Sequence, residues 1–135
     1  MPTASYNKFT PAVENLLENI NAGSDTWVLK LGTAVNQAAG TFTETTNGGG
    51  YTTGGVTLTT VSSSQSGGTF KLVLSAASPT WTGSGSGFTF QYAVLVDSTT
   101  STNVAYWDYG TSQAVATGET VTVTLDGTNG VFQVV

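Results

Sequence analysis

Two carboxylates, Asp97 and Asp108, are the residues of this sequence whose spacing is best suited to acid–base chemistry. They lie near the ends of two expected strands, residues 88–96 and 104–109, so a hairpin would let them face each other. A glycosidase needs two such carboxylates about 5 to 9.5 Å apart in a cleft. Ordinary turn chemistry explains the same residues, with Asp97 capping a turn and Asp108 solvating a strand end. We favour the turn interpretation and predict no catalytic pair.

Two other motifs resemble ligand-binding loops. Residues 126–130 (Asp-Gly-Thr-Asn-Gly) offer oxygen ligands, but they lack the repeated Asp or Asn and the terminal Glu of an EF-hand. A hairpin turn explains all five residues. Glycines cluster at residues 48–50 and 83–87, yet neither cluster has the Lys-Ser/Thr of a phosphate loop or opens a helix. We predict turns at these places and no metal or cofactor.

Three residue types that often carry chemistry, Cys, His and Arg, are absent from the 135 residues. Their absence excludes a thiol nucleophile, a disulfide, a Ser–His pair and an arginine clamp on phosphate. The net charge is −5, and Lys8, Lys30 and Lys71 are too few and too scattered to neutralise a nucleic-acid backbone. We therefore predict a protein that is not an enzyme, needs no cofactor and binds no nucleic acid.

Aromatic residues are the remaining candidates for function, because the chain holds 3 Trp, 5 Tyr and 6 Phe and few reactive groups. Trp81 stands in a Gly/Ser-rich loop, and the 106–109 segment places rings on both faces of one strand. Exposed rings often mark protein interfaces or sugar-binding platforms; packing of the helix or a loop over them is the other interpretation. The predicted interface residues are Tyr6, Phe9, Tyr51, Trp81, Trp107 and Tyr109.

These residues need elements that position them, and the first is a short helix. Residues 1–10 are expected to form a polar N-terminal arm, followed by a helix over residues 11–22. Thr10 suits the N-cap, and Pro11 suits the first helical position. The apolar residues at helical spacing are Val13, Leu16, Leu17 and Ile20. Because so short a helix is not stable alone, we expect this stripe to pack on a sheet.

From Trp27 onward the apolar residues alternate with period two, which is the spacing of strands. Strands are expected at residues 27–31, 56–61, 70–74, 88–96, 104–109, 121–125 and 131–135. Long loops are expected at residues 33–55, with at most one short edge strand, and at 76–87. The pattern predicts a mainly β fold, an antiparallel β-sandwich or jelly-roll-like domain of seven to eight strands over residues 11–135 with one short N-terminal α-helix. No signal peptide or membrane-spanning stretch is visible, so we expect folding in the cytoplasm and no membrane partner.

Several short motifs follow one another along nearly the whole chain. They are residues 6–9 and 13–16, 23–26, 50–52 with Gly54 and Gly55, 69–74, 79–82, 90–95, 107–110, 118–120 and 126–131. Together they resemble a family of small virion proteins of tailed bacteriophages, which we take to be head decoration (cement) proteins. The segment 31–46 is shorter and less apolar than that family's pattern.

The resemblance implies a structural virion protein that binds and stabilises a phage capsid lattice. Its partner would be the major capsid protein, its place the capsid exterior after assembly in the host cytoplasm, and its form a small homo-oligomer. The resemblance brings no catalytic residues. Residues 1–10 would act as a flexible arm that gains order on a neighbour. The alternatives are a carbohydrate-binding or host-adhesion module that stacks sugars on Trp81, Trp107 and Tyr109, and another head or tail structural protein.

Overall fold

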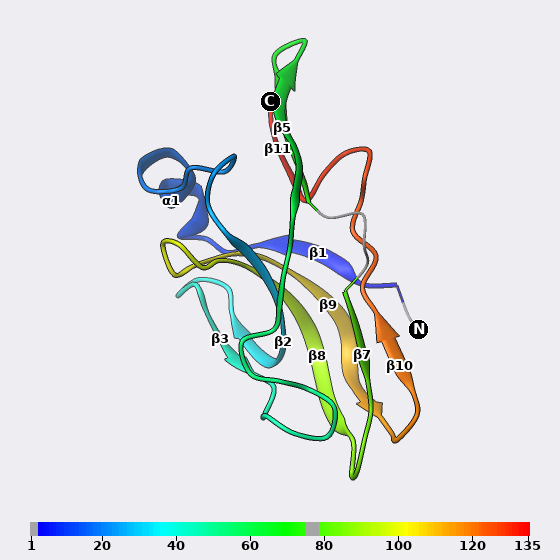
Figure 1. Cartoon of the computed structure of the whole chain (residues 1–135). Helices are drawn as coiled ribbons and strands as arrows, with labels where there is room; N and C mark the ends of the chain where they lie inside the picture. Colours follow the sequence, from blue (N-terminus) through cyan, green and yellow to red (C-terminus); the bar gives the residue numbers. More distant parts are fainter. Residues whose placement is uncertain (1–2, 75–78) are drawn as a thin grey trace.

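Strands dominate the fold, and they pair antiparallel throughout (Figure 1). The computed structural model describes residues 3–74 and 79–135. In chain order the elements are β1 (Ser5–Lys8), α1 (Ala12–Glu18), β2 (Trp27–Asn36), β3 (Thr41–Glu44), β4 (Val56–Thr57), β5 (Thr60–Ser66), β6 (Thr69–Leu74), β7 (Thr80–Thr82), β8 (Phe88–Asp97), β9 (Thr102–Val115), β10 (Thr120–Thr122) and β11 (Phe132–Val134). The predicted mainly β sandwich with one short helix is confirmed, with eleven strands in the described residues instead of seven or eight.

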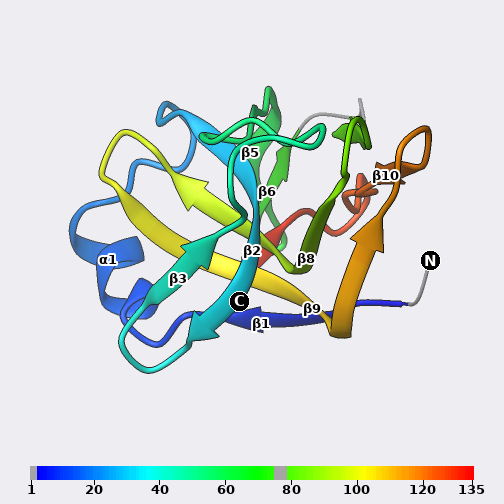
Figure 2. The same cartoon turned by 90° about the horizontal axis from the view of Figure 1, so that it is seen from below.

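The main sheet has the strand order β1-β9-β8-β2-β3, and β4 also pairs with β2. Two smaller sheets, β11-β6-β5 and β10-β7, form the second layer. Figure 2 shows the main sheet on one side of the core and these smaller sheets on the other. The alternation predicted for Trp27, Leu29 and Leu31 places all three in the core. Trp27 then meets Phe132 of β11 with ring centroids 5.9 Å apart, which joins the two layers.

The N-terminal segment is an edge strand of the main sheet, which differs from the loose arm expected of residues 1–10. Its residues in β1 pair with β9, with Tyr6 opposite Trp107. Phe9 follows at once and is fully buried. A polar strand is missed by hydrophobic periodicity because backbone pairing, not apolar alternation, holds it in place. Residues 1 and 2 lie outside the described residues.

The helix is shorter than the predicted range of 11–22 and turns a different face to the core. Pro11 occupies the N-cap position expected for Thr10, and the backbone N–H of Ile20 bonds back to Asn15 beyond the helix end. Ala12 is buried, whereas two residues of the predicted stripe, Val13 and Leu17, are exposed. The helix contacts β9, and of the predicted stripe Leu16 and Ile20 are half-buried while Val13 and Leu17 stay in solvent.

The predicted loops contain more strand than expected. Residues 41–44 form β3, the short edge strand allowed within 33–55. Trp81 lies in β7, where it pairs with Val121 and is buried. Residues 75–78, which include the start of the predicted 76–87 loop, lie outside the described residues. Strand β9 continues beyond the predicted end at 109, since its outer half also pairs with β8. This half is polar, so apolar alternation does not reveal it.

One hairpin projects from the body of the domain. Strands β5 and β6 are joined by a tight turn at Gly67 and Gly68, and β11 lies beside β6 (Figure 1). Both glycines have positive φ angles, 59° and 86°, which side-chain-bearing residues rarely adopt. The expected strand 70–74 lies in β6, whereas the expected strand 56–61 is divided between β4, which pairs with β2, and β5, which extends to Ser66 and pairs with β6.

Candidate functional site

Six large apolar side chains are exposed within residues 3–74 and 79–135, and five of them lie together. The five are Tyr6, Val13, Leu17, Val134 and Val135. They line one cavity of about 710 Å³ between α1, β1, β9 and the C-terminal residues 130–135. The sixth, Val61, lies elsewhere, on β5. We call this cavity the apolar groove.

The floor of the apolar groove is an uncovered strip of the main sheet's inner face. Trp107 is paired with Ala93 and Ala93 with Leu31, so these side chains share the face that carries the core residue Leu31. Tyr6, opposite Trp107 on β1, belongs to the same face. The two rings meet edge to face, with centroids 5.5 Å apart. The strip is open because the second layer ends at β11 while the main sheet continues to β1.

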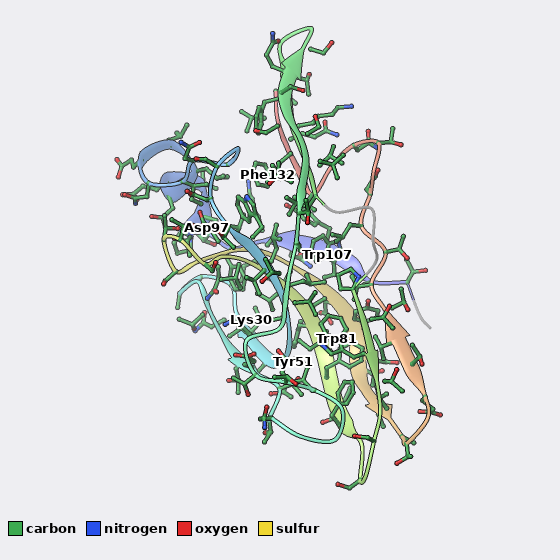
Figure 3. All side chains as sticks on the ribbon, viewed as in Figure 1. Lys30, Tyr51, Trp81, Asp97, Trp107 and Phe132 are labelled. Atoms are coloured by element: carbon green, nitrogen blue, oxygen red, sulfur yellow. The ribbon has the colours of Figure 1, made fainter. Side chains whose placement is uncertain are left out.

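The two walls of the apolar groove come from α1 and β11. On α1, Leu17 is 85% exposed and Val13 is 47% exposed. On β11, Phe132 packs inward, and Val134 shares its face because alternate strand residues point the same way. Val134 is nevertheless 50% exposed, since no side chain fills the groove beneath it. Figure 3 shows Phe132 near the base of the projecting strands and Trp107 on the main sheet.

Two charged residues, Lys8 and Asp126, line the apolar groove. Only the Lys8 ammonium is available to a ligand. The Asp126 carboxylate accepts hydrogen bonds from the backbone of Thr128 and Asn129, both at 2.8 Å. These bonds, with the Asn129 side chain, lower the pKa of Asp126 and confirm the predicted turn at 126–130. Lys8 has no carboxylate within 4.0 Å in the described residues; the ion pair there is Lys30 with Glu44, at 3.6 Å.

The structure separates the six predicted interface residues into two groups. Tyr6 and Trp107 line the apolar groove. The four buried in the core are Phe9, Tyr51, Trp81 and Tyr109. Figure 3 shows Tyr51 and Trp81 together in the lower half of the domain, away from Phe132. The sugar platform considered as an alternative for Trp81, Trp107 and Tyr109 therefore lacks two of its three rings, because Trp81 packs against Tyr51 and Tyr109 packs against Phe90 of β8.

Asp97 and Asp108, the two carboxylates considered as a catalytic pair, do not face each other. In the β8–β9 register Asp97 is opposite Thr102 and Asp108 is opposite Tyr92, so they stand at separate positions along the hairpin. Asp97 accepts hydrogen bonds from the backbone N–H groups that follow it, at 2.9 and 3.2 Å. Asp108 accepts from Gln91 and from the backbone of Gly110. Asp97 therefore caps a turn as predicted, whereas Asp108 lies inside β9, which continues to Val115, and not at the expected strand end.

Asp97 is also a fully buried acid. Its Oδ2 atom has no hydrogen-bond partner among the described residues. Burial, together with the neighbouring Asp25 carboxyl, raises the pKa of Asp97. A buried carboxylate is costly unless it is paired, which is the physical reason that burial raises this pKa.

Tyr51 anchors the long loop between β3 and β4. Its hydroxyl donates to Glu44 Oε1 at 2.7 Å and accepts from the backbone N–H of Leu31 at 3.2 Å. The same Glu44 oxygen accepts from the backbone of Gly54 at 2.7 Å. Along this edge of β2, β4 pairs with residues 28 and 29 and β3 pairs from Gly32 onward, so neither strand supplies a partner for the Leu31 N–H. The Tyr51 hydroxyl takes that place. Burial and the Glu44 carboxylate raise the pKa of Tyr51.

The glycine clusters serve close packing of loops. The backbone N–H of Ser84 donates to the carbonyl of Gly49 at 2.9 Å. A Cβ atom on Gly49 would collide with the carbonyl oxygen of Gly87, so the two loops approach to a distance that only glycine permits. The prediction of tight turns in place of a phosphate loop agrees with this arrangement.

The described residues contain no cluster of three or more acidic side chains suited to a metal ion. None of the helices described is long and apolar enough to cross a bilayer. Sequence reasoning missed Val13, Leu17, Val134 and Val135, because apolar residues are assigned to the core by default. The apolar run 131–135 was the one available signal. Comparisons with protein-family models, with curated proteins and with solved structures find no match for this chain.

Proposed function

We propose that this protein is a structural virion protein that binds and stabilises a phage capsid lattice, as a decoration or cement protein does. The observation that carries the proposal is the apolar groove, which gathers five of the six exposed large apolar side chains of the described residues. Large apolar side chains that are exposed together in one place mark interaction sites on soluble proteins. The motifs shared with small phage virion proteins point to the major capsid protein as the partner.

The chemistry of the chain supports binding over catalysis. It has no Cys, His or Arg; Asp97 and Asp126 accept backbone hydrogen bonds in turns, and Asp108 accepts one from Gly110 within β9. The burial of Trp81 and Tyr109 favours lattice binding over the carbohydrate-binding alternative, because sugar stacking needs exposed rings.

The proposed mechanism is additive. Each copy covers a small apolar area of the shell, and many copies on a symmetric lattice make modest contacts effective together. Assembly as a small symmetric oligomer would multiply the contacts that each unit makes. The net charge of −5 suits the capsid exterior, where the protein is kept away from packaged DNA.

The test is co-sedimentation of the purified protein with capsids assembled from the major capsid protein of the same virus. We expect saturable binding with a fixed stoichiometry and a higher temperature of capsid disruption. Leu17→Asp should weaken binding, whereas Val61→Asp, an exposed apolar residue outside the groove, should not. Binding to tails or to glycans with none to capsids would overturn the proposal.

A further inference from the structure

We infer that the apolar groove takes one extended, mainly apolar segment of the partner, which adds as a strand to the free edge of β11. This inference rests on the proposed function and names the kind of segment that the lattice would supply. Strand addition to an exposed edge uses backbone hydrogen bonds for affinity and alternate side chains for specificity.

The edge of β11 carries none of the charge or irregularity found on the edge strands β1, β3 and β5. Edge strands usually carry charges, proline or a bulge that prevent pairing with another chain. Here β1 ends in Lys8, β3 ends in Glu44, and β5 is Ser-rich with an irregularity between residues 60 and 62. The run 131–135, Val-Phe-Gln-Val-Val, has no charge and no proline, and β11 pairs with β6 without a register shift. Such an edge is suited to a partner strand.

The position of the groove fits a strand on that edge. β11 bonds to β6 on one side, and its other side is the end of the sheet. Val134 already faces the apolar groove. Alternate side chains of an added strand would point the same way, toward Tyr6 and Trp107 on the floor and Leu17 on the opposite wall.

The size of the groove favours a segment over a second globular copy. A stable interface between globular proteins buries about 800 Å² and roughly 20–30 residues on each side. Here five exposed apolar side chains form the patch, and the cavity of about 710 Å³ is in the range of roughly 300–1,000 Å³ that encloses small ligands or short segments. Backbone hydrogen bonds to β11 would supply the affinity that the small area does not.

The charge of the apolar groove sets a further requirement on the partner segment. Lys8 has no ion-pair partner in the described part of the chain, while the Asp126 carboxylate is occupied by its own turn. The groove therefore offers one available positive charge on a protein whose net charge is −5. At this groove a second copy, which also carries a net charge of −5, is disfavoured, whereas an apolar segment with one acidic residue would complement Lys8; the proposed oligomer would assemble through another surface.

The experiment is hydrogen–deuterium exchange on the capsid-bound protein, with the free protein as reference. We expect those amides of residues 132–134 that point away from β6 to exchange at least tenfold more slowly on the capsid, because alternate N–H groups of β11 gain partners across its free edge. Leu17→Asp and Val134→Asp should each weaken capsid binding at least tenfold, since a buried leucine or valine contact is worth more than one factor of ten. Lys8→Glu should weaken it about three- to fivefold.

The matched control is Val61→Asp, which places the same charge at another exposed apolar position and should bind as the unmodified protein does. Each variant should unfold in urea with one transition at an unchanged slope. Capsid binding without slower exchange at 132–134 would overturn the inference and leave the proposed function standing; no capsid binding at all would overturn both. Slower exchange that appears with protein concentration, without capsids, would overturn the inference in favour of a second copy.

Discussion

Replacing Tyr51 by Phe removes one oxygen atom from the core and tests how the 45–55 loop is held. The hydroxyl is buried, and it joins Glu44 to the backbone N–H of Leu31. A hydrogen bond to a charged group contributes about 1.5–3 kcal/mol, and a buried N–H left without a partner costs about 1–3 kcal/mol. Glu44 keeps its bond to Gly54, which limits the loss on that side. We expect the free energy of unfolding to fall by about 3 kcal/mol.

The same loss of stability should lower the midpoint of thermal unfolding. Unfolding entropy near 2.1 cal/mol/K per residue gives a Tm lower by about 10 °C for a domain of this length. The assay is urea and thermal unfolding followed by tryptophan fluorescence. The control is Tyr109→Phe, since the Tyr109 side chain lies in the core but its hydroxyl makes no hydrogen bond within the described residues. A loss in Tyr51→Phe no larger than that in the control, or below about 1 kcal/mol, would refute the assigned role.

Three further predictions concern stability. Phe9→Ala should cost about 3–5 kcal/mol in urea unfolding because Phe9 is a core residue, whereas the half-exposed Tyr6→Ala should cost much less; equal effects would contradict β1 as part of the domain. Gly49→Ala should destabilise far more than Gly67→Ala, since both have a similar positive φ but only the first collides with a neighbouring backbone; circular dichroism melts would separate them. The pKa of Asp97 is higher in the folded protein than in the unfolded chain. As pH rises above about 4, Asp97 therefore loses its proton in the unfolded chain before it does so in the folded protein, and the free energy of unfolding falls until the pH passes the folded-state pKa. Asp97→Asn should raise stability at pH 7 and flatten that decline in urea melts from pH 4 to 8; an unchanged slope would exclude Asp97 as its cause.

Period-two apolar alternation was sufficient to predict the central strands. Residues 27–31, 70–74 and 88–96 lie in β2, β6 and β8, because each alternates strongly and is buried. The strands that were missed, β1 and β7, are short and polar on one side. Their pairing partners lie about a hundred and about forty residues away in the sequence, so no local pattern reveals them.

The candidate site was less predictable than the fold. Tyr6 and Trp107 were identified because rings on both faces of an aromatic strand imply that one set is uncovered. The helix offered two faces, one with Ala12 and the other with Val13 and Leu17, and hydrophobicity alone favours the second. The first is buried, where α1 contacts β9. Which face of α1 is buried depends on where the second layer of strands ends over the main sheet. This is a property of the assembled sandwich and cannot be read from the sequence of the helix.

The β5–β6 turn offers a place to attach foreign sequence. A Cβ atom at Gly67 or Gly68 would meet no atom within 4 Å, and the turn stands at the end of the projecting hairpin (Figure 1). A peptide inserted between these glycines would extend into solvent without disturbing the core, since loop tips of this kind tolerate insertion. On a repeating shell, each bound copy would present that peptide at a fixed spacing, which makes this hairpin a natural position for multivalent antigen display.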